Sequence, residues 1–156
     1  MLPSTDRIAY RRAAPCVVVA LLAVVAGGAI SAGLAHAPSR PVMWLVAYLV
    51  LVVGVAQAAL ALVQASVAVR PPSPLMASAQ CIAFNLANAM VIAGTLLANP
   101  PAVSAGAALL VIALALFLRG VRGAHGPLVR IYRVLVAALG FSALVGVALA
   151  LWRARG

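Results

Sequence analysis

The chain has 156 residues, of which 67% are hydrophobic and 8% are charged. A soluble domain carries about 25% charged residues, and a domain of this length keeps much of its surface in water. The composition therefore excludes a soluble globular protein. The net charge of +10 comes from arginines in short segments between apolar runs, where arginine indicates membrane topology and not nucleic-acid binding.

Five apolar runs follow one another along the chain, each long enough to cross the hydrocarbon layer as a helix. In order they cover residues 17–34, 42–69, 75–98, 102–118 and 128–152. All ten prolines fall at or outside the ends of these runs, as expected of residues that disrupt helix interiors. Because backbone groups in lipid must bond internally, the sequence predicts an all-α integral membrane protein, an antiparallel bundle of about five transmembrane helices.

The predicted organisation is a basic cytoplasmic tail (1–14), a single transmembrane domain (15–152) and a short C-terminal tail (153–156). The first run also resembles a secretory signal peptide, because a basic leader precedes it and Ala35-His36-Ala37 follows it. Pro38 would follow the scissile bond and disfavours cleavage. We expect the first helix to be retained, and the alternative is a four-helix protein that lacks residues 1–37.

The loop arginines predict an orientation. With the N-terminus in the cytoplasm, eight arginines lie inside and three outside, so the N-terminus is expected inside and the C-terminus outside. Trp44 and Trp152 then form an outer aromatic belt, with Tyr10 and Tyr132 at the inner interface. The absence of lysine beside abundant Ala, Val, Arg and Gly suggests a GC-rich bacterial genome, and we expect the bacterial inner membrane.

Four arginines surround the glycine-rich loop before the fifth run and are expected to contact anionic lipid headgroups: Arg119, Arg122, Arg130 and Arg133. The first turns of that run, from Leu128 to Arg133, are amphipathic. They are expected to lie along the inner headgroups with Arg130 and Arg133 on one face.

Polar and small residues recur at helical spacing within the runs. The polar ones that could form a seam between the second and third helices are Gln57, Gln64, Asn85, Asn88 and Thr95. They are interpreted as hydrogen-bonding links between helices, with a solute-lining path as the alternative. Gly54, Ser142 and Gly146 are predicted helix-packing positions. The second, third and fifth helices are expected to be central.

The sequence lacks most of the residues that common catalytic mechanisms require. The only acidic residue is Asp6, which excludes paired-carboxylate catalysis and an intramembrane acid for proton coupling. His36 and His125 are predicted at opposite membrane faces, and Cys16 and Cys81 form no metal motif. We therefore expect no catalytic, metal or cofactor site and no enzyme activity within the chain.

The function favoured by these patterns is a non-catalytic membrane protein, either an accessory or scaffold subunit of a complex or a homo-oligomer. Its expected partners are the bilayer and another membrane subunit or a second copy, with no nucleic acid. One alternative is a small-solute transporter or channel that uses the amide seam. Another is a cofactor- or quinone-associated subunit of a larger membrane enzyme.

Overall fold

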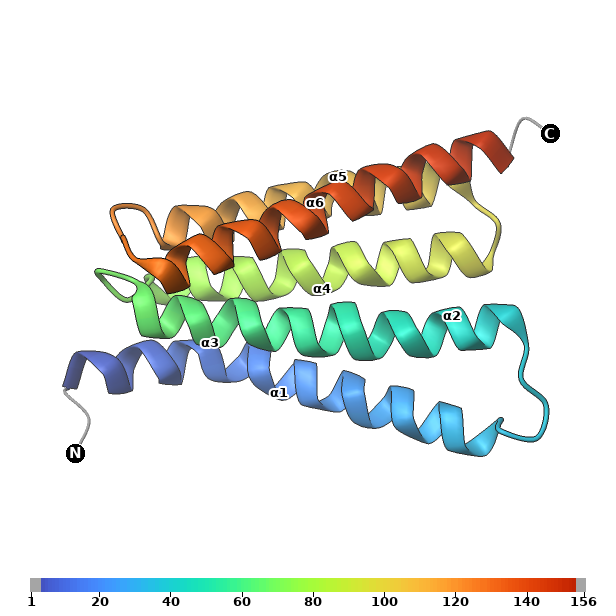
Figure 1. The fold of residues 1–156 in the computed structure, drawn as a ribbon, viewed down its shortest axis with the longest axis horizontal. Helices are drawn as coiled ribbons and strands as arrows, with labels where there is room; N and C mark the ends of the chain where they lie inside the picture. Colours follow the sequence, from blue (N-terminus) through green and yellow to red (C-terminus); the bar gives the residue numbers. More distant parts are fainter. Residues whose placement is uncertain (1–3, 154–156) are drawn as a thin grey trace.

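The chain folds as an antiparallel bundle of long helices, as Figure 1 shows for the computed structural model, which describes residues 4–153. The elements are α1 (Ser4–Gly33), α2 (Arg40–Tyr48), η1 (Leu49–Ala56), α3 (Gln57–Val67), α4 (Pro74–Leu96), α5 (Pro100–Gly120) and α6 (Pro127–Arg153). Since α2, η1 and α3 are continuous, five helical segments are long and apolar enough to cross a membrane. The predicted fold class is confirmed.

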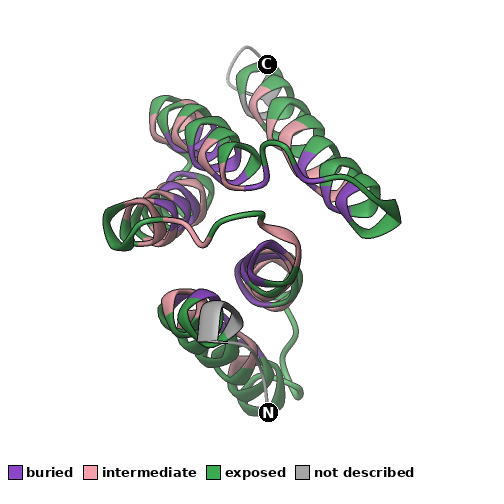
Figure 2. Ribbon diagram, turned by 90° about the vertical axis from the view of Figure 1, so that its left-hand side faces the viewer, coloured by how far each residue is buried: buried purple, intermediate pink, exposed green. Residues whose placement is uncertain are grey.

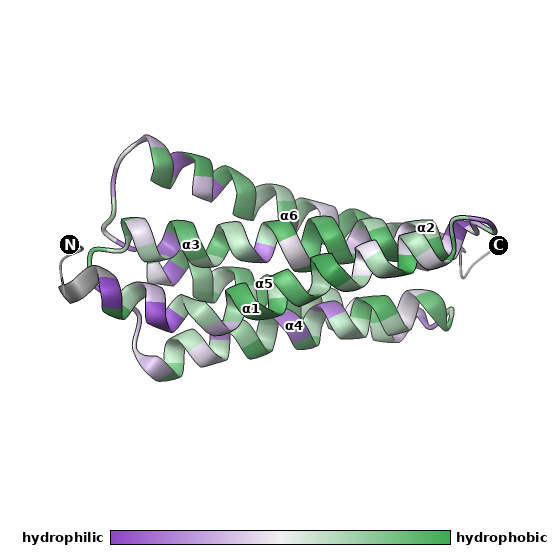
Figure 3. Ribbon diagram, turned by 90° about the horizontal axis from the view of Figure 1, so that it is seen from below, coloured by the Kyte–Doolittle hydropathy of each residue, from purple (hydrophilic) through white to green (hydrophobic). Residues whose placement is uncertain are grey.

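Antiparallel order gives the bundle two chemically different ends. The N-terminal end holds the start of α1 and the loops 68–73 and 121–126, whereas the C-terminal end holds the loops 34–39 and 97–99 and the end of α6 (Figure 1). Hydrophilic residues gather mainly at these two ends (Figure 3). Eight arginines belong to the N-terminal end: Arg7, Arg11, Arg12, Arg70, Arg119, Arg122, Arg130 and Arg133.

Helix boundaries follow the proline and capping signals. Pro74 occupies the first turn of α4, where the Ser73 side chain accepts a hydrogen bond from the Met76 amide at 3.2 Å. Asn99 caps α5 in the same way, through the Ala102 amide. These caps satisfy amides that have no partner within the first turn of a helix. The third and fourth runs therefore begin within two residues of the predicted positions.

The first helix begins earlier than predicted, at Ser4 and not at Val17, so most of the expected N-terminal tail is helical. Contacts with the bundle stabilise these turns: the Tyr10 hydroxyl bonds Ser66 at 3.0 Å, and Arg12 donates to the Pro72 carbonyl. Pro15 therefore lies inside α1 and does not mark its start. A proline there removes one backbone hydrogen bond and bends a helix, and α1 changes direction after its first turns (Figure 1).

The second span contains an irregularity that the hydropathy pattern did not indicate. η1 is a π-helical segment, a wider backbone turn that is rare in proteins. It packs closely on α1, since a Cβ atom at Gly54 would overlap Val24 and one at Gly27 would lie 2.7 Å from Val50. Two glycines thus allow the close approach of α1 and η1.

The core lies among α3, α4, α5 and the N-terminal half of α6, and it includes Cys16 of α1. Phe84 and Phe117 meet edge to face with ring centroids 6.2 Å apart, and Tyr132 is only 1% exposed. Tyr132 was predicted in the inner aromatic belt; that prediction is wrong, because its ring faces the core. Figure 2 shows the buried positions on the sides of the helices that face one another.

The prediction that the fifth helix is central is also wrong. In the most apolar stretch of α5, 39% of the residues are buried. In the corresponding stretch of α6 only 11% are buried, which is the lowest share among the five spans. Beyond Val136 no residue of α6 whose burial is described is buried. The physical reason is glycine placement: Gly94 and Gly106 bring α4 and α5 together, with a Cβ on either meeting backbone atoms at 2.7–2.9 Å.

Candidate functional site

The predicted polar seam divides into separate structural links. Gln57 is fully buried and donates from Nε2 to the Cys16 carbonyl at 3.1 Å, which joins α3 to α1. Gln64 is 3% exposed and lies against Gly120 at the end of α5. Its Nε2 has no hydrogen-bond partner among residues 4–153. Both amides therefore face neighbouring helices.

On α4 the predicted residues have three different environments. Asn88 is buried, accepts a hydrogen bond from the Tyr48 hydroxyl at 2.7 Å and donates to the Phe84 carbonyl. Asn85 is half-buried and donates to the Cys81 carbonyl of its own helix at 2.8 Å. Thr95 is exposed. The structure therefore does not bring the five seam residues together along one path.

Sequence reasoning missed Gln80, the buried amide that joins α4 to α5. It is 2% exposed and donates to the Leu116 carbonyl at 2.9 Å. The buried face of α4 runs through Gln80, Phe84, Ala87, Asn88 and Gly94. Its spacing in the sequence did not mark Gln80 as buried, because apolar residues lie on every side of α4.

A small cavity lies beside Gln64 and Gln80, lined also by Arg12, Cys16 and Phe117. Its volume is about 10 Å³. A cavity of about 10–15 Å³ can hold one water molecule, which also needs two or more polar partners. The cavity is thus the size of one water, and it offers no room for a larger solute.

A much larger hollow is a cleft at the C-terminal end, which we call the α2–α6 cleft. It has a volume of about 920 Å³. α2 and α6 form its walls and α4 and α5 its floor, and in Figure 1 α2 and α6 diverge toward this end. Residues that line it include Arg40, Trp44, Tyr48, Thr95, Ser142 and Gly146.

The packing residues predicted from the sequence differ in their surroundings. Gly54 is buried against α1, as described above. Ser142 and Gly146 instead line the α2–α6 cleft, and a Cβ atom on Gly146 would meet no atom within 4 Å. Both residues therefore border a hollow, and Gly146 has open space beside it.

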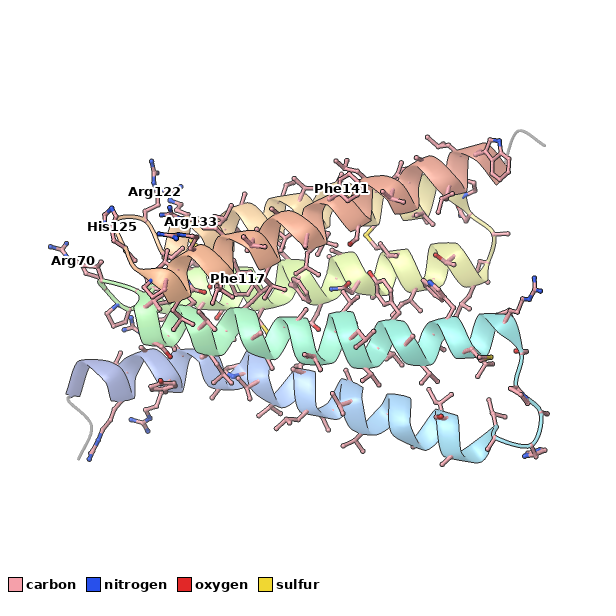
Figure 4. The ribbon with its side chains drawn as sticks, viewed as in Figure 1. Arg70, Phe117, Arg122, His125, Arg133 and Phe141 are labelled. Carbon is pink, nitrogen blue, oxygen red and sulfur yellow. The ribbon has the colours of Figure 1, made fainter. Side chains whose placement is uncertain are left out.

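The remaining charged and histidine candidates lie at the ends of the bundle. Arg119, Arg122, Arg130 and Arg133 are exposed at the N-terminal end, and Figure 4 shows Arg122 and Arg133 there beside His125. His36 is exposed in the 34–39 loop at the opposite end, so the two histidines do not converge.

Cys16 and Cys81 are free thiols on α1 and α4. Within the described residues no three His, Cys, Asp or Glu side chains gather as a metal site. No family model, no curated protein and no solved structure matches the chain.

Proposed function

We propose that the chain is a non-catalytic accessory or scaffold subunit of the bacterial inner membrane, which assembles with a transmembrane helix of another subunit or of a second copy. One observation carries the proposal: the buried amides Gln57 and Gln80 donate to backbone carbonyls of neighbouring helices, and the buried Asn88 accepts a hydrogen bond from Tyr48 of α2. Amides used in this way stabilise a helical bundle.

We assign assembly to α6, because a smaller share of its residues is buried than in any of the other four spans. Phe141 is 70% exposed and Leu144 63% exposed on its outward side, and Figure 4 shows Phe141 pointing away from the bundle. Helices in lipid associate through side-chain packing and not through hydrophobic transfer. A partner helix on this side would supply the packing contacts that the second half of α6 lacks.

For orientation, we propose that the N-terminal end lies in the cytoplasm. Eight arginines belong to this end, and positively charged loops are retained on the cytoplasmic side. Arg119, Arg122, Arg130 and Arg133 would then contact anionic headgroups of the inner leaflet. The opposite end of the bundle, which holds the loops 34–39 and 97–99, would then face outward.

The transport alternative has weaker support. Of the five seam residues, only Thr95 lines the α2–α6 cleft, and the cavity beside Gln64 holds no more than one water. A solute path would require polar groups along one continuous opening.

The proposal is tested by placing a photo-reactive residue at Phe141 of the full chain in its native membrane. The matched control position is Leu21 of α1, which is 59% exposed and also apolar. We expect a protein adduct at Phe141, either with a second polypeptide or with another copy, and little or none at Leu21. If the Phe141 probe yields only lipid adducts, or if both positions yield the same protein adducts, α6 is not an assembly surface.

A further inference from the structure

The α2–α6 cleft combines an apolar interior with a cationic mouth. Its deeper lining includes Val52, Leu110 and Leu139, and its mouth includes Arg40, the first residue of α2. Arg40 is the only charged residue that lines the cleft within the described part of the chain. Such a combination matches a molecule with a hydrocarbon body and an anionic end.

We propose that the α2–α6 cleft is a binding site for one anionic phospholipid, whose phosphate pairs with Arg40 and whose acyl chains fill the apolar part. A guanidinium group binds phosphate through two parallel hydrogen bonds. The N-terminus of α2 adds to the attraction, because the Ser39 side chain makes no cap and the first turn holds no acidic residue. This site is independent of the assembly surface on the outward side of α6.

Two hydroxyl groups that line the cleft already donate hydrogen bonds within the protein, which favours hydrocarbon as the neighbour of these groups. The Tyr48 hydroxyl donates to Asn88 at 2.7 Å, and the Ser142 hydroxyl donates to the Leu139 carbonyl at 2.8 Å. A polar solute would therefore lose its hydration without gaining hydrogen bonds from these groups. Trp44 and Tyr48, with ring centroids 5.1 Å apart, suit the glycerol level of a bilayer, where such aromatic residues are enriched.

The space along α6 suits acyl chains, which are narrow and flexible. The cleft has a volume of about 920 Å³, and a Cβ atom on Gly146 would meet no atom within 4 Å, so the chains have room there. The same space makes Gly146 a position where a larger side chain would occupy the site without a clash.

The test uses native mass spectrometry of the full chain in mild detergent, with added phosphatidylglycerol or with diacylglycerol of the same acyl chains, which has no phosphate. The wild-type protein is expected to retain one phosphatidylglycerol per chain. One charge-assisted pair predicts about a tenfold tighter binding than that of diacylglycerol. Arg40→Gln should abolish this preference, and Gly146→Leu should reduce the retention of both lipids by about tenfold.

Two control variants separate the cleft from general lipid contact. Arg70→Gln removes an exposed arginine at the N-terminal end, and Gly28→Leu enlarges an exposed glycine of α1 that has open space; both should bind as the wild type does. The proposal is overturned if both lipids bind equally well, or if Arg40→Gln keeps the preference. It is also overturned if the controls lose lipid as much as the cleft variants do.

Discussion

At the scale of single residues, glycine has opposite roles in different parts of the bundle. A Cβ atom on Gly106 would lie 2.9 Å from the Ala87 carbonyl oxygen, a backbone atom that cannot turn away. At Gly28 and Gly146 a Cβ atom would meet nothing within 4 Å. The sequence spacing of small residues indicated Gly146 as a packing position, yet it cannot reveal on which side a neighbouring helix lies.

This contrast predicts the result of a matched pair of substitutions. Gly106→Ala should lower the free energy of unfolding by about 1–3 kcal/mol, the usual cost of forcing atoms into a filled contact. Gly28→Ala, on the exposed side of α1, should change it little. Reversible unfolding in mixed detergent micelles measures both values. Equal effects of the two substitutions would show that α4 and α5 are not in the close contact described.

At the scale of elements, the Tyr48–Asn88 hydrogen bond joins α2 to α4, at a distance from the loop 68–73 that connects the second and third spans. Interhelical hydrogen bonds in membranes contribute about 0.6 kcal/mol on average and up to about 1.7. A double-mutant cycle with Tyr48→Phe and Asn88→Leu should therefore give a coupling free energy of about 1 kcal/mol in the same unfolding assay.

Tyr132→Phe is the control for that cycle, because the Tyr132 hydroxyl is buried without a hydrogen-bond partner among residues 4–153. Removal of an unsatisfied buried hydroxyl should leave stability unchanged or raise it. A coupling near zero between Tyr48 and Asn88, or a loss of stability in Tyr132→Phe equal to that in Tyr48→Phe, would contradict the assigned contacts.

The number of helices, their type and most of their boundaries could be predicted from the sequence, because apolar runs and prolines determine them from nearby residues alone. The start of α1 could not, since its first turns depend on Tyr10 and Arg12 meeting residues of α3 and of the loop after it. Burial was also unpredictable, because all five spans are apolar on every side and periodicity then carries little information. Gln80 was missed for the same reason, whereas Asn88 was named but its partner Tyr48 was not.

At the scale of the whole molecule, the charge separation and the number of spans together support the topology that we propose. An odd number of spans places the described ends on opposite sides of the membrane, and the eight arginines of the N-terminal end favour the cytoplasm for that end. This topology would place Arg40 and the mouth of the α2–α6 cleft at the outer leaflet. Retention of the first helix is essential to it, because cleavage after residue 37 would leave four spans.

The most direct measurement is labelling of single cysteines in intact cells with a membrane-impermeant maleimide, in a background where Cys16 and Cys81 are replaced by alanine. Cysteines replace Ile8, Ser39 and His125, one at a time. The five-span topology predicts labelling at position 39 in intact cells, and labelling at positions 8 and 125 only after the membrane is opened. Labelling of position 125 from outside, or loss of position 8 from the mature chain, would contradict it.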